Sequence, residues 1–360
     1  MEYRTKSVFG KYAEQLQVLV DTNIEKFKEP FFPKYFGMGT PQMGLTYATV
    51  IGKARIEAAA SVVAHGSEAP LRSRAGLDRL SGEIAALKVK RKMDEQNYRD
   101  YLTMQAVNVS DQAKKSQILQ FIWDDVKYVV DSVTARLDIM VSQALSTGKI
   151  PINATTNPDG VVSGDIDLLV PAAHNQTGTA AFGWSLTGRN WANSGSATPI
   201  TDIRKLTQDL WNDEGIVHDK ILMTPSKWWD VQKTEEVTDA FDGSPNLANF
   251  NTFMQSNQLP IVEIVNVRAK IEKDGVLTSV NTWEDNKYIT FVPDGQLGTI
   301  HNALSVEQIS PVEGVNYATN NNMLVSKWAQ TEPFGEFTRG EIAAFPGLEI
   351  ADTMHIVKVN

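Results

Sequence analysis

Residues 111–147, DQAKKSQILQFIWDDVKYVVDSVTARLDIMVSQALST, carry the longest regular pattern in the chain. Apolar side chains recur in steps of three and four residues, at Ile118, Ile122, Val126, Val129, Val133, Leu137, Met140 and Ala144. This spacing places them on one face of an α-helix. Gly148 stands where a left-handed C-terminal cap belongs, and Pro151 blocks continuation. The sequence predicts a helix of about ten turns, roughly 50 Å long.

Such a helix is longer than is usual in globular domains, and it indicates a coiled coil, a bundle or the backbone of an elongated molecule. Its apolar stripe covers only one side, and no other segment matches it in length. These two observations favour the backbone of an elongated molecule.

The segment before this helix contains a basic run, LKVKRKM at residues 87–93, in a chain of net charge −9. Three lysines alternate there with other residues, and a period of two predicts a strand with one cationic face. The stretch APLRSR, residues 69–74, is the candidate second arm of a two-stranded flap, with its tip in residues 75–83. A ribbon of this kind needs a surface to lie on.

The remaining segments differ in character. Residues 1–65 predict an amphipathic arm, and residues 152–198 predict strands and loops. Residues 199–307 alternate between helical and strand patterns, which predicts one compact α+β domain inserted in the chain. Residues 308–360 predict strands that close on a sheet.

Composition limits the function. The chain has 360 residues, of which 42% are hydrophobic and 21% charged, so a globular protein with a sizeable core is expected. Its acidic balance argues against a dedicated nucleic-acid binder. It has no cysteine, which excludes disulfides and thiolate chemistry. No apolar segment long enough for a signal sequence or a membrane span is present.

No pattern of catalytic or cofactor-binding residues emerges. The five histidines are scattered without the spacing of a helical metal site, so each is expected to be solitary. Asp165 and Asp167 fit the polar face of a strand better than a cation site. The pair Trp228 and Trp229 lies on a predicted helix, so at least one should be in the core. We therefore predict no enzymatic activity, no cofactor and no metal.

The order of arm, charged flap, very long helix, inserted α+β domain and closing strands resembles the major capsid proteins of tailed bacteriophages. Three stretches are similar to the phage lambda major head protein group: PLRSRAG followed by ALKVKRKM, YITFVPDGQLGTIHNAL, and AQTEPFGEF before IVKV. The resemblance implies an α+β, HK97-like capsid fold. Its parts would be an N-arm at 1–65, an E-loop at 66–108, a P domain at 109–198 that contains the spine helix 111–147, an A domain at 199–307, and a closing P-domain segment at 308–360.

The resemblance implies a subunit that assembles with itself into pentamers and hexamers of an icosahedral shell around double-stranded DNA. A scaffolding protein, a portal and a decoration protein would be its partners, and contact with the packaged DNA would be weak and non-specific. The protein would be assembled in the host cytoplasm and located in the virion, with no membrane partner. Some relatives crosslink a flap lysine to a neighbour, but the lambda group is not marked by this chemistry.

Charge complementarity predicts how the basic segment acts in such a shell. Its cations would meet acidic patches of adjacent subunits and fix their register, and the candidates are Arg72, Arg74, Arg79, Lys88, Lys90, Arg91 and Lys92. Two alternatives remain: a cellular nanocompartment shell protein of the same fold, and a monomeric glycan-binding or glycan-active protein that could use Trp184, Trp191, Trp228 and Trp229.

Overall fold

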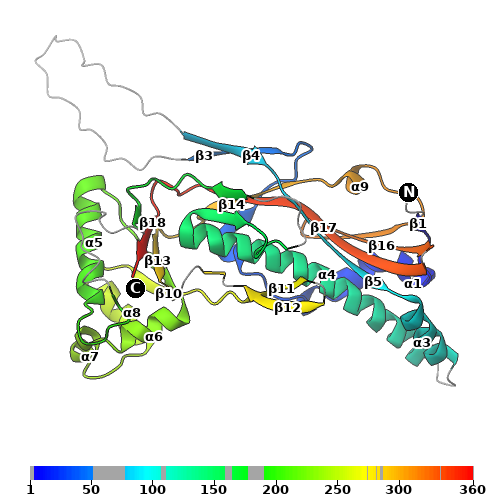
Figure 1. Cartoon of the computed structure of the whole chain (residues 1–360), viewed down its shortest axis with the longest axis horizontal. Helices are drawn as coiled ribbons and strands as arrows, with labels where there is room; N and C mark the ends of the chain where they lie inside the picture. Colours follow the sequence, from blue (N-terminus) through cyan, green and yellow to red (C-terminus); the bar gives the residue numbers. More distant parts are fainter. Residues whose placement is uncertain are drawn as a thin grey trace, which may run out of the picture.

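The computed structural model describes residues 4–51, 78–106, 111–158, 164–176, 190–273, 275–280, 282–283, 287–332 and 334–359. The molecule is elongated, with a large sheet toward one end and a smaller sheet with its helices at the other (Figure 1). One long helix, α4, runs lengthwise beside both sheets (Figure 1). Within the described part of the chain, no helix is long and apolar enough to span a membrane.

Helix α4 spans Asp111–Thr147, which confirms the length predicted from the apolar spacing. All eight side chains of the predicted stripe are buried. Gly148 adopts a φ of 68° directly after the helix, and its amide donates to the carbonyl of Ala144 at 3.0 Å. The predicted left-handed cap is therefore confirmed. A shorter helix, α3 (Glu95–Ala106), precedes α4.

The large sheet has seven strands in the order β1-β16-β17-β14-β2, with β15 paired to β16 and β5 paired to β17. These strands are β1 (Arg4–Thr5), β2 (Phe36–Met38), β5 (Ala86–Met93), β14 (Gly298–Ala303), β15 (Asn316–Asn320), β16 (Met323–Thr331) and β17 (Phe334–Leu348). All pairs are antiparallel except β14 with β2. Strand β17 is central because it pairs with β16, β14 and β5.

Helix α4 packs directly on β17. A Cβ atom added at Gly340 of β17 would lie 3.0 Å from the carbonyl oxygen of Val129 and 3.1 Å from its Cβ. The absence of a side chain at Gly340 therefore allows the helix to approach the sheet closely. The main hydrophobic core forms along this contact and includes Val126, Leu137 and Phe345.

The basic run does not form an arm of the flap, so the predicted pairing of residues 87–93 was wrong. Strand β5 pairs along its whole length with β17, from Met93 opposite Glu336 to Ala86 opposite Ala343. The period-two pattern fixed the faces of this strand, but its partner is a strand some 250 residues later in the chain. Residues 69–74, the predicted second arm, lie outside the described residues.

A two-stranded flap is nevertheless present, formed by β3 (Thr46–Ile51) and β4 (Asp78–Glu83). Residues 78–83, predicted as part of the tip, are therefore one of its arms. The flap lies above the body of the molecule (Figure 1). Its base is anchored by Tyr47, whose ring stacks on Phe345 and on His301, each with centroids 5.0 Å apart.

The second sheet has five strands in the order β10-β9-β13-β18-β8. They are β8 (Asn175–Gln176), β9 (Lys220–Met223), β10 (Ile261–Ile264), β13 (Tyr288–Val292) and β18 (His355–Lys358). Strand β18 pairs antiparallel with β13 and parallel with β8, which confirms that the closing alternation joins a sheet. The sheet thus combines three distant segments of the chain.

Four helices accompany this sheet: α5 (Pro199–Glu214), α6 (Pro225–Gln232), α7 (Glu235–Phe241) and α8 (Leu247–Ser256). Their apolar faces form a second core with the sheet, which includes Leu210, Phe250 and Phe291. Within the same range, β11 (Ala269–Lys273) and β12 (Val276–Val280) form an antiparallel pair of their own. The proposed domain boundaries stay a prediction: β14 lies within 199–307 but pairs in the large sheet.

The N-terminal segment lies against the large sheet and α4. Its helices are α1 (Lys11–Glu14), α2 (Leu16–Thr22), η1 (Ile24–Lys26) and η2 (Phe32–Lys34), and α2 packs on β15. Arg4 forms an ion pair with Glu307, in which Nη1 of the guanidinium lies 2.7 Å from Oε1 of the carboxylate. Three further short elements are β6 (Lys149–Ile152), its partner β7 (Gly164–Asp167), and α9 (Val306–Ile309).

Candidate functional site

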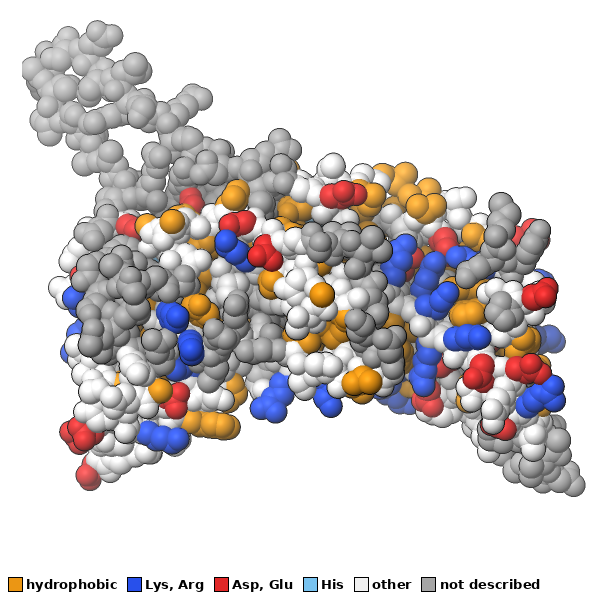
Figure 2. All heavy atoms as spheres, in the orientation of Figure 1, with side chains coloured by type: hydrophobic (Ala, Val, Ile, Leu, Met, Phe, Trp, Pro, Cys, Tyr) orange, Lys and Arg blue, Asp and Glu red, His pale blue; other side chains and the backbone are white. Residues whose placement is uncertain are grey.

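Strand β5 presents the predicted cationic face. Lys88, Lys90 and Lys92 are exposed, whereas Leu87 and Val89 pack against the main core and Met93 is buried in it. Lys and Arg side chains gather on the surface where β5, β16 and β17 lie (Figure 2). The alternation seen in the sequence thus separates a core face from a charged face.

Several of these cations have partners within the same chain. The Nζ atom of Lys88 lies 2.7 Å from Oε1 of Glu341, the residue opposite it on β17. Lys90 lies over the ring of Phe337, with Nζ 4.8 Å from the centroid. Arg91 points toward α4, where its Nε is 3.4 Å from Oδ1 of Asp125. In the described part of the chain, Lys92 forms no ion pair.

The other predicted contact residues are less well placed by the structure. Arg72 and Arg74 lie outside the described residues. Arg79 belongs to β4, opposite Val50 of β3. The structure therefore brings Lys88, Lys90, Arg91 and Lys92 together on one strand, with Arg79 in the flap. Their contact with other subunits stays a prediction.

A buried charge network that the sequence analysis missed lies beneath β5. Lys327 of β16 is fully buried, with Nζ 3.7 Å from a carboxylate oxygen of Asp125 on α4 and 3.7 Å from one of Glu336 on β17. It donates to Oγ1 of Thr338 at 2.8 Å. Glu336 accepts from the hydroxyl of Ser7 and from the amide of Val8. The network ties the N-terminal segment to the helix and the sheet.

Burial opposes charge in this network. It lowers the pKa of Lys327, although Glu336 and Asp125 favour the ammonium. Burial also raises the pKa of Asp125, and this is partly offset by Lys327 and Arg91. Because each charge has an opposite partner, the group can remain ionised inside the protein. The only sequence signal was a lysine within the mostly apolar strand MLVSKWAQ.

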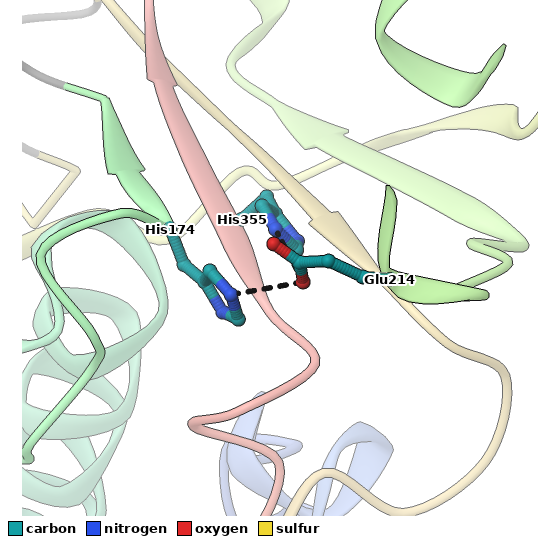
Figure 3. A group of neighbouring side chains, drawn as sticks. All are labelled: His174, Glu214 and His355. Atoms are coloured by element: carbon teal, nitrogen blue, oxygen red, sulfur yellow. Dashed lines mark ion pairs between the residues drawn. The ribbon is translucent and has the colours of Figure 1, made fainter. Parts of the chain in front are cut away.

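Three histidines form a second cluster, so the expectation that each histidine is solitary was wrong. His174 precedes β8, His355 begins β18, and both side chains approach Glu214 at the end of α5 (Figure 3). Nε2 of His174 is 3.0 Å from Oε2 of Glu214, and Nε2 of His355 is 3.9 Å from the same atom. His218 completes the group, with its Nε2 3.2 Å from Nδ1 of His355.

Burial keeps two of these imidazoles neutral. It lowers the pKa of His218 to about 4 and that of His355 to about 2. The neighbouring histidines lower both values further, whereas the carbonyl of Thr353 opposes the shift. The spacing of these histidines along the chain does not indicate the cluster, because its residues come from segments that meet only in the folded sheet.

The tryptophan pair does not form a stacking platform. Trp228 is buried, and its ring makes an edge contact with Phe250 at 5.0 Å between centroids, which confirms the predicted core position. Trp229 is 54% exposed on the other side of α6. A single exposed ring offers only one wall for a sugar or a base.

Comparison with known proteins gives matches among solved structures alone, since no family model and no curated protein matches the sequence. A protein assigned as the capsid protein of a prophage of E. coli CFT073 aligns over 100% of both chains, with a TM-score of 0.56 and 14% identity. The chain has the HK97-like capsid fold. A phage-related protein of Bordetella bronchiseptica RB50 covers 99% of this chain, with 98% of its own length, a TM-score of 0.49 and 9% identity.

The mature capsid of bacteriophage PhiM1 aligns with 92% of the chain and 87% of its own length, at a TM-score of 0.47 and 13% identity. The end-to-end match to the prophage capsid protein, at a TM-score of 0.56, confirms the α+β capsid fold predicted from the order of elements. The finer resemblance to the lambda head protein group stays a prediction, because no comparison singles out that group.

Proposed function

We propose that this chain is a major capsid protein, which assembles with copies of itself into the pentamers and hexamers of an icosahedral phage shell around double-stranded DNA. The observation that carries the proposal is the end-to-end match to the prophage capsid fold over 100% of both chains.

The surface of the subunit supports self-association. Three apolar side chains in and after α9 are exposed: Val306 by 78%, Ile309 by 49% and Val312 by 42%. Hydrophobic atoms are visible along the edge of the molecule where α9 lies (Figure 2). Contiguous apolar surface of this kind is characteristic of protein–protein contacts. The flap adds reach, since it extends the contact surface without enlarging the core.

We also propose that the basic residues connect neighbouring subunits, with Arg72, Arg74, Arg79, Lys88, Lys90, Arg91 and Lys92 as the contacts. Among those described, Lys92 is the sharpest candidate, because it is exposed and forms no ion pair with a described residue of its own chain. Lys88 and Arg91 also hold acidic residues of their own chain, so changing them would disturb the subunit itself.

In this proposal the finished protein resides in the virion after assembly in the host cytoplasm. A scaffolding protein, a portal and a decoration protein would act with it during assembly. The acidic balance of the chain, −9 overall, supports weak and non-specific contact with packaged DNA, because a strongly basic lining would bind the genome tightly.

The first prediction tests the contact at Lys92. Reversal of its charge in Lys92→Glu should prevent closed particles or reduce their yield at least about tenfold, since like charges across an interface oppose association. The thermal midpoint of the isolated subunit should stay unchanged. Negative-stain electron microscopy and sedimentation velocity measure assembly, and circular dichroism measures the subunit fold.

Lys233→Glu is the matched control, because Lys233 is also exposed, carries the same charge and lies at the end of α6 far from β5. Normal particles from Lys92→Glu would contradict the proposed contact. A wild-type chain that stays a monodisperse monomer and binds soluble sugars would contradict the capsid function itself. Closed shells that contain a co-expressed enzyme and no DNA would identify a nanocompartment instead.

A further inference from the structure

The histidine cluster has the donor atoms of a transition-metal site. Nε2 of His174, Oε2 of Glu214 and Nε2 of His355 come from three separate segments, and one ligand atom of each lies within 4.8 Å of the others. Figure 3 shows both rings beside the carboxylate of Glu214. Two imidazoles and one carboxylate form a donor set that zinc accepts in proteins.

The two rings are held inside the protein beside Glu214. His355 is fully buried and His174 is 8% exposed. A metal ion binds histidine through an unprotonated ring nitrogen, and Nε2 of each ring is the nitrogen that approaches Glu214. Glu214 remains partly exposed, with 26% of its side chain accessible, which leaves a route for an ion and a water molecule.

Two polar groups lie behind the His355 ring. Its Nδ1 lies 3.2 Å from Nε2 of His218 and 3.3 Å from the carbonyl oxygen of Thr353, which also accepts from Nε2 of His218 at 2.7 Å. The proposed site uses the tautomer of His355 that carries its proton on Nδ1. A proton on Nδ1 that is donated to this carbonyl leaves the lone pair of Nε2 directed toward Glu214. Such a backbone acceptor behind a ligating histidine is the usual support of a metal site.

We propose that His174, Glu214 and His355 bind one divalent transition-metal ion of the zinc class, with water in the fourth position. His174 and His355 stack with centroids 4.1 Å apart. Binding of one ion by both rings would require the His174 ring to turn about its side chain until its Nε2 faces that ion. No described residue forms a hydrogen bond with Nδ1 of His174 that would oppose this rotation. Glu214 then exchanges its contact with His174 for the metal.

A bound metal ion would connect three segments that are far apart in the sequence. It would connect the turn before β8, the end of α5 and the start of β18 within the second sheet. This property goes beyond the proposed shell function, since it concerns residues within one chain rather than contacts between chains. Metal binding can therefore be measured on the unassembled chain.

The second prediction is stoichiometric binding of Zn²⁺ by the chelator-treated, full-length subunit at pH 7.5. Isothermal titration calorimetry should give one ion per chain, and Zn²⁺ should raise the thermal midpoint while Mg²⁺ should not. His174→Gln and Glu214→Gln should each weaken Zn²⁺ binding by at least about tenfold, because each removes a ligand. His301→Gln is the matched control, since His301 lies in β14 beside Tyr47, outside the cluster, and its affinity should match wild type.

A wild-type subunit without stoichiometric Zn²⁺ binding would overturn the proposal, as would wild-type affinity in both ligand variants. X-ray absorption on the Zn²⁺-loaded wild type provides a test that does not depend on variants that fold. Two imidazole nitrogens at about 2.0–2.1 Å support the site, whereas a shell of oxygen ligands alone overturns it.

Discussion

Lys327 has no exposed surface, and the carboxylates of Asp125 and Glu336 stabilise its buried ammonium group. The third prediction is that Lys327→Met destabilises the subunit by about 3–5 kcal/mol, because it leaves Asp125 and Glu336 buried without this cation. Denaturant titration measures the loss. Lys233→Met, at an exposed position, should change the free energy of unfolding by less than about 0.5 kcal/mol.

The loss in free energy of unfolding that Lys327→Met causes should become smaller as the pH falls. Lys327 lowers the pKa of Asp125, so its removal lets burial raise that pKa further. A carboxyl group whose folded-state pKa is raised stabilises the protein below its unfolded pKa and loses this effect as the pH rises. A deficit that stays constant from neutral to acidic pH would contradict the view that unpaired carboxylates cause it.

The sequence alone could not predict which residues come together in the two buried clusters, and the reason is physical. Lys327, Asp125 and Glu336 come from two strands and a helix, and their pairing is fixed only when these elements pack. Likewise, the spacing of His174, His218 and His355 along the chain carries no metal-site pattern. By contrast, the faces of β5 could be predicted, because alternation is a local property of a strand.

At the scale of elements, the close contact between α4 and β17 depends on Gly340. The fourth prediction is that Gly340→Ala lowers the free energy of unfolding by about 1–3 kcal/mol, because the new Cβ would lie 3.0 Å from the carbonyl oxygen of Val129. Chemical denaturation measures the change. Gly44→Ala is the control, since a Cβ at Gly44 would meet no atom within 4 Å. Equal stability of the two variants would contradict a steric cause.

Elements differ in how far the sequence predicts them. The spacing of apolar residues and the Gly148 cap specify α4 locally, so both its length and its end were predicted correctly. The same local information gave the strand character of β5 but not its partner. Strand pairing depends on contacts between distant segments, and β17 and residues 69–74 are equally compatible with a period of two. The error was therefore one of pairing rather than of element type.

At the scale of the whole molecule, His218 and His355 make folding depend on pH. Each has a folded-state pKa below its ordinary value, so unfolding takes up protons between about pH 6.5 and 4. The fifth prediction is that the free energy of unfolding falls with acidification in this window, by about 1.4 kcal/mol per pH unit for each histidine. Denaturant titrations across this range measure the slope, and His218→Gln should reduce it. An unchanged slope would contradict the contribution of His218.

The capsid fold was predicted from the order of elements, but the pairing of distant strands in its two sheets was not. The long helix and the closing strands appear as expected, because each has its own local pattern. Strand β14 joins the large sheet and β18 the second sheet, so the two cores share chain segments. That sharing depends on tertiary packing, which no local periodicity reports.

The position of β18 has a consequence for synthesis of the protein. Strands β9, β10 and β13 leave the ribosome before β18 does, and among the described strands β8 pairs only with β18. The second sheet therefore cannot close on a nascent chain until residue 358 has been translated and released from the exit tunnel. An unfinished polypeptide lacks the completed sheet, so translation itself delays the appearance of a mature subunit.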